Sequence, residues 1–155
     1  MAFAVVRTDN VGGTTLGSLL RSAKLNQDIE NGSVVKLTSL VEGEREIYQA
    51  EAPAGAVMGQ FALVASPEKM YDERKRNLDE FINEAGIPFR CYVLTHGDVF
   101  SVTEEAFSEA APNVGDTIAL PASGYKWAVS GGTGVGTCIS IDSDSGYTYY
   151  GIRID

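Results

Sequence analysis

A cysteine, the chain's single histidine and an aspartate lie close together in the stretch GIPFRCYVLTHGDVFSVT, residues 86–103. Nucleophilic catalysis can use a thiol beside an imidazole base, with a carboxylate that orients the base. If residues 89–96 form one strand, however, Cys91 and His96 point to opposite faces and lie about 16 Å apart, at about 3.3 Å per residue. A nucleophile and its base need hydrogen-bond reach of about 3 Å. The spacing therefore favours a buried Cys91 and a turn or bulge at His96-Gly97 over a catalytic pair.

Other chemical motifs are incomplete. The sequence has no G-x-S-x-G to accompany His96, and no CxxC, HxH or HExxH to bind zinc. The glycine-rich stretch 130–136 lacks Gly-Lys-[Ser/Thr] and precedes a predicted strand, which indicates a flexible connection. Residues 142–146 (DSDSG) begin like a calcium loop but lack its later ligands. We interpret them as a polar hairpin loop, with weak calcium binding as the alternative, and we expect no catalytic, cofactor or metal residues.

Charge and composition exclude several classes of protein. The 155 residues carry 12 basic and 21 acidic side chains, a net charge of −9, which argues against nucleic acid and anionic membranes as partners. The N-terminus has no signal-peptide pattern, and the stretch 54–65 is too short to span a bilayer. We expect a soluble protein in which Cys91 and Cys138 are free thiols.

The 17 glycines and the runs of Val, Ile, Thr and Tyr indicate a mainly β protein. We expect an N-terminal part, 1–32, with a short strand at 3–7 and an irregular arm, and one β-rich domain at 33–155. SVVKLTSLV and EREIYQAE predict a hairpin that turns at Glu42-Gly43, and QFALVA predicts a strand buried on both sides. Further strand pairs are predicted at 87–95 with 98–103, 116–120 with 125–129, and 135–141 with 147–154. These strands predict a small antiparallel barrel or sandwich.

One amphipathic helix is expected at about 67–85. Ser66 is suited to cap it, Pro67 to occupy its first position, and Gly86 to end it. Apolar side chains between these limits fall on one arc at helical spacing.

Several segments resemble the small structural proteins of tailed-bacteriophage heads. The resemblance extends over about residues 29–129 and rests on 29–37, 46–48, 66–73, 88–92, 97–103 and 114–116. It implies a protein that decorates or cements the shell, binds the major capsid protein, often as a trimer, and has no catalysis or cofactor. It also implies a location on the capsid surface of the virion, after assembly in the host cytoplasm.

The function expected is therefore a non-enzymatic reinforcement of the capsid. A tail, head–tail joining or fibre-base component is the alternative within the same class. An enzyme or small-molecule-binding module is a third possibility, suggested by the acidic residues and by the cluster Tyr147, Tyr149 and Tyr150.

Overall fold

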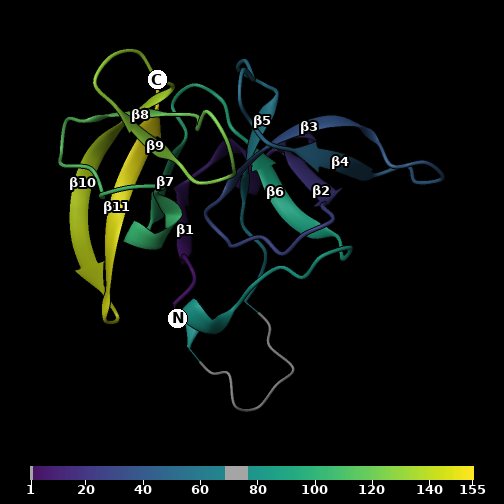
Figure 1. Cartoon of the computed structure of the whole chain (residues 1–155), viewed down its shortest axis with the longest axis horizontal. Coiled ribbons are helices and arrows are strands. Elements are labelled where there is room, and N and C mark those ends of the chain that lie inside the picture. The colour runs from purple at the N-terminus through teal and green to yellow at the C-terminus, as the bar shows by residue number, and fades with distance from the viewer. Residues whose placement is uncertain (1, 69–76) are drawn as a thin grey trace.

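Two β layers pack together in the computed structural model, which describes residues 2–68 and 77–155 (Figure 1). One is a closed five-stranded barrel in the order β2-β4-β3-β5-β6, and the other is a six-stranded sheet in the order β1-β7-β11-β10-β8-β9. The mainly β expectation is confirmed. The barrel strands are β2 (Leu20–Lys24), β3 (Val34–Leu40), β4 (Ile47–Glu51), β5 (Phe61–Val64) and β6 (Phe89–Val93). The sheet strands are β1 (Val6–Asn10), β7 (Val99–Val102), β8 (Thr117–Ala119), β9 (Ala128–Ser130), β10 (Gly136–Asp144) and β11 (Tyr147–Ile154).

Three of the predicted strand pairs form antiparallel hairpins: β3 with β4, β8 with β9, and β10 with β11. The prediction that 87–95 pairs with 98–103 is wrong. Strand β6 pairs with β2 and β5 in the barrel, whereas β7 pairs with β1 and β11 in the sheet. The chain changes layers at His96-Gly97, where Gly97 adopts φ +91°, and its amide bonds to Ile154 of β11 instead of closing a hairpin.

The N-terminal segment predicted as an irregular arm supplies a barrel strand. Strand β2 runs parallel to β4 and antiparallel to β6, and so closes the barrel. Of its five residues only Ala23 is buried, so the apolar periodicity that identifies a strand is missing here. Short 3-10 turns, η1 (Gly12–Thr14) and η2 (Gly17–Leu19), precede it, and the first strand lies at 6–10 instead of 3–7.

The helix predicted at 67–85 is not found. Residues 69–76 lie outside the described residues, and 77–85 contain one 3-10 turn, η3 (Leu78–Glu80). Asn77 and Glu80 cap that single turn, after which the backbone is extended and Asn83 pairs with Ile29. The described residues contain no α-helix, and the other short turn is η4 (Glu104–Ala106). They likewise hold no helix with the length and apolarity needed to cross a bilayer.

Ser66 does not act as a helix cap. Its amide donates to Asn31 Oδ1 at 3.0 Å, and its hydroxyl accepts from the Arg90 amide at 3.0 Å. Asn31 also accepts from Asn83 Nδ2 at 3.1 Å. These long-range bonds hold the chain beside β6 and outweigh the local preference of Ser-Pro for a helix start.

Two apolar clusters lie on opposite faces of β5, all four residues of which are buried, as predicted for QFALVA. Ala62 and Val64 face the barrel interior, whereas Phe61 and Leu63 face the sheet. The cluster against the sheet also contains Trp127, which is fully buried and whose ring lies 5.4 Å from that of Phe100. The Trp127 indole N–H donates to the Gly32 carbonyl at 2.9 Å and thereby ties the sheet layer to the chain entering β3.

Trp127→Ala should lower the free energy of unfolding by about 3–5 kcal/mol, because it leaves a large cavity and an unpaired buried carbonyl. Chemical denaturation followed by far-UV circular dichroism measures the change. Val129→Ala, at a partly exposed position two residues further along, should cost about 1 kcal/mol or less. Equal losses for the two variants would contradict the assignment of Trp127 to the core.

Candidate functional site

Cys91, His96 and Asp98 do not form a joint site. Cys91 is fully buried in the barrel, and its thiol donates weakly to the Arg21 carbonyl at 3.6 Å. Burial raises the pKa of this thiol to about 12, and the nearby charge of Arg21 opposes the rise. His96 lies on the exposed turn, where its Nδ1 is 2.5 Å from the Asp155 carbonyl oxygen. The thiol is thus kept protonated inside the barrel, and the imidazole faces another part of the chain.

Asp98 has a structural task that the sequence did not reveal. Its buried carboxylate accepts from the Gly12 amide at 3.0 Å, the Thr95 amide at 2.9 Å and the Thr95 hydroxyl at 3.3 Å. Its backbone carbonyl also accepts from the Ile154 amide at 2.8 Å. Asp98 therefore joins the turn between the layers to η1 on one side and to β11 on the other.

The Cys91 thiol should react with a thiol reagent only when the protein unfolds. With a pKa of about 12, about 0.01% of it is thiolate at pH 8. In a Cys138→Ala background, the labelling rate should follow denaturant-induced unfolding, and His96→Ala should leave it unchanged. If the native protein were labelled fast and His96→Ala slowed this labelling, the hypothesis of a catalytic pair of Cys91 and His96 would be supported again.

Cys91 also predicts a pH dependence of stability. The unfolded chain loses the thiol proton near the ordinary pKa of 9.0, whereas the folded chain keeps it up to about 12. The native state therefore binds more protons between these values, and the free energy of unfolding should fall as the pH rises through this range. Cys91→Ala should reduce that slope in alkaline denaturation curves; an unchanged slope would show that other groups cause it.

Asp98→Ala should destabilise the protein by about 1–3 kcal/mol, because it leaves two backbone amides without their acceptor. Denaturant unfolding measures the loss. Glu84→Ala, on an exposed side chain, serves as the control and should change stability by about 0.5 kcal/mol or less. A loss no larger than that of the control would show that Asp98 is not a structural joint.

The acidic residues of the suspected calcium loop belong to strand β10. The strand extends to Asp144, and the turn consists of Ser145-Gly146 alone, both with positive φ as in a type I′ hairpin. The Arg7 guanidinium contacts Asp142 at 3.3 Å and Asp144 at 3.8 Å. In the part of the chain that the structure describes, no three potential ligands gather as a metal site. A cation of the protein itself thus occupies the position between these carboxylates.

The tyrosine cluster takes part in the same arrangement. Arg7 lies over the Tyr149 ring, with Cζ 4.6 Å from its centroid, and forms a 2.7 Å ion pair with Asp9. Tyr149 is buried under this cover, whereas Tyr150 packs edge to face on Phe107. Two of the three tyrosines are therefore packing residues on opposite faces of the sheet.

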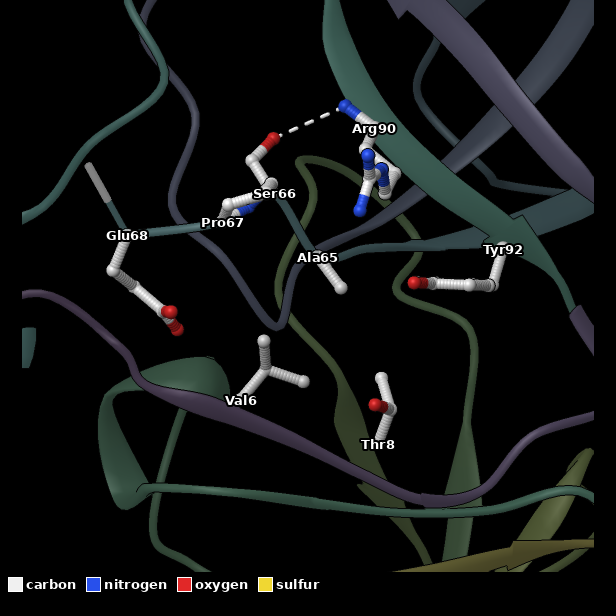
Figure 2. Close-up of a pocket in the computed structure, with 8 residues that line it drawn as sticks. All are labelled: Val6, Thr8, Ala65, Ser66, Pro67, Glu68, Arg90 and Tyr92. Carbon is white, nitrogen blue, oxygen red and sulfur yellow. Dashed lines mark hydrogen bonds between the residues drawn. The ribbon is translucent and has the colours of Figure 1, made fainter. Parts of the chain in front are cut away.

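A cleft of about 180 Å³ opens where β1 meets the barrel (Figure 2). Strand β1 forms one wall, the segment that follows β5 forms the second, and β6 forms the third. The lining residues are Val6, Thr8, Ala65, Ser66, Pro67, Glu68, Arg90 and Tyr92.

Backbone bonds and close packing hold the β6 wall in place. The Arg90 amide donates to the Ser66 hydroxyl, and its carbonyl accepts from the Ala65 amide, each at 3.0 Å. The Tyr92 ring lies so close to Gly13 that a Cβ there would come within 2.5 Å of the ring. Both side chains therefore start from a fixed backbone.

Three polar side chains of the cleft have no partner among the described residues. In the described ranges 2–68 and 77–155, the Arg90 guanidinium forms no ion pair, and the hydroxyls of Thr8 and Tyr92 form no hydrogen bond. Figure 2 shows the polar ends of Arg90 and Tyr92 directed into the cleft, opposite Thr8 and the carboxylate of Glu68. This arrangement can bind a small polar group.

Sequence reasoning missed this cleft. Arg90 and Tyr92 are two positions apart on one strand, a signal that they share a face. Thr8, however, joins them through packing of two layers, which no local pattern encodes. Comparison with family models, with curated proteins and with solved structures gives no match to this chain.

Proposed function

We propose that this chain is a non-enzymatic structural protein of a tailed-phage virion that binds and reinforces the outer surface of the capsid. Its partner is the major capsid protein, and a trimer is the favoured form of self-association. Two things support the proposal: the resemblance of residues 29–129 to phage head proteins, and a group of exposed leucines at one end of the barrel.

This leucine end consists of Leu16, Leu20 and Leu40, which are 58%, 36% and 43% exposed. The parallel register aligns Ser22 of β2 with Ile47 of β4, and the start of β4 lies beside the end of β3. Leu20 and Leu40 therefore border the same end of the barrel, and Leu16 precedes Leu20 by the single turn η2. Gathered exposed aliphatic side chains are typical of surfaces that bind other proteins.

The hairpin between β3 and β4 projects from this same end, away from the sheet (Figure 1). Its tip carries three exposed acidic residues, Glu42, Glu44 and Glu46, and the single base Arg45. An acidic tip beside an apolar surface suits a partner that offers a basic rim around an apolar centre. The leucine end is the observation on which the proposal chiefly depends.

The purified protein should bind phage capsids from which the native decoration has been removed, as measured by co-sedimentation. Leu16→Asp should weaken binding about tenfold or more, because burial of one leucine contributes about 1.5–3 kcal/mol. Val114→Asp, at an equally exposed position in the sheet layer, is the control and should bind as the wild type does.

Failure of the wild type to bind capsids would overturn the proposal. Binding to isolated tails instead of heads would replace it with the tail or joining role. Equal effects of the two aspartate variants would show that the leucine end is not the contact surface.

A further inference from the structure

We propose that the cleft between β1 and the barrel binds one carboxylate, that of an aspartate or glutamate side chain on the partner protein. The identification of that partner as the capsid rests on the proposed function, whereas the chemistry of the cleft does not. Arg90 supplies the cation, and Tyr92 and Thr8 supply hydroxyl donors.

The choice of a carboxylate follows from the groups that the cleft leaves unpaired. A guanidinium offers parallel N–H donors that match the two oxygens of a carboxylate. The remaining lone pairs of that carboxylate can accept from the Tyr92 and Thr8 hydroxyls, which have no other partner in the described residues. The Arg90 guanidinium and the Tyr92 and Thr8 hydroxyls, which line one cleft, thus supply the donors that this group needs.

The size of the cleft favours a side chain over a larger ligand. At about 180 Å³ it is smaller than the roughly 300–1,000 Å³ of pockets that hold drug-sized molecules or cofactors. The end of one acidic side chain fits a cleft of this size.

Glu68 limits the charge of the ligand. Its carboxylate lies in the same cleft as Arg90, so the site carries one positive and one negative side chain (Figure 2). Glu68 repels any anion in the cleft, and it repels a dianion such as phosphate more strongly than a single carboxylate. Glu68 therefore acts as a selectivity residue.

The cleft adjoins the leucine end. Leu20 lies directly across from Tyr92 in the β2–β6 register, and Ser22 lies across from Arg90. Side chains of opposed residues share a face, so Leu20 and Tyr92 belong to the same outer wall of the barrel. A protein that covers Leu20 can therefore place an acidic side chain beside Arg90.

A short peptide with blocked termini and one glutamate, titrated into the full chain, probes the site directly. NMR should show the Arg90 side-chain N–H signals shifting, and Arg90→Gln should weaken binding at least tenfold. Glu68→Gln should strengthen it severalfold. Arg153→Gln, at an exposed position of β11 in the sheet layer, is the matched control and should leave it unchanged.

Three results would overturn the carboxylate site. The first is that the same peptide with glutamine in place of glutamate binds equally well. The second is that the Arg90→Gln variant binds the peptide as well as the wild type does. The third is that inorganic phosphate binds more tightly than the peptide. Denaturant unfolding of Arg90→Gln and Glu68→Gln confirms that each variant is folded.

The capsid assay separates this inference from the proposed function. Arg90→Gln should reduce capsid affinity about tenfold. If the wild type and Arg90→Gln bind capsids equally while Leu16→Asp does not, the cleft has no part in docking and the inference fails alone. If the peptide binds at Arg90 but neither the wild type nor any variant binds capsids, the proposed function fails and the carboxylate site stands.

Discussion

Strand β5 exposes neither face to solvent, and the rest of the structure depends on this. Ala62 and Val64 belong to the barrel interior, while Phe61 and Leu63 belong to the cluster beneath the sheet. A single strand of four apolar residues is thus shared by two cores. Because each face of β5 needs a cover, the barrel and the sheet stabilise one another instead of standing as separate units.

Polar groups fix how the two layers meet. The Trp127 indole donates to Gly32, and the Asp98 carboxylate accepts from Gly12 and Thr95. Apolar burial is non-directional, whereas these buried hydrogen bonds are satisfied in one arrangement only. The residues that first suggest catalysis, Cys91 and Asp98, are therefore parts of the barrel core and of the joint between the layers.

The cleft lies where the cover of the barrel wall ends. Beneath the sheet, the outer wall of β5 and β6 is buried, and Tyr92 belongs to this buried part although it lines the cleft. Beyond β1 the wall is exposed at Arg90 and at Leu20 in the neighbouring strand. An apolar side chain and an unpaired cation on one wall are compatible with the proposed docking surface. The proposed capsid contact and the proposed carboxylate site are two parts of this wall.

By itself the sequence determined the mainly β class, the three hairpins and the burial of QFALVA, because these follow from side-chain alternation and from turn residues such as Ser145-Gly146. It also indicated that Cys91 and His96 cannot meet on one strand. Only the tertiary structure decided that β6 and β7 enter different layers, that 20–24 closes the barrel, and that Ser66 bonds to Asn31 and Arg90 instead of starting a helix. The cleft between Thr8 and Arg90 belongs to this second group as well. The physical reason is the same for all four: each depends on contacts between residues far apart in the chain, and local propensities of about 1 kcal/mol or less yield to such contacts.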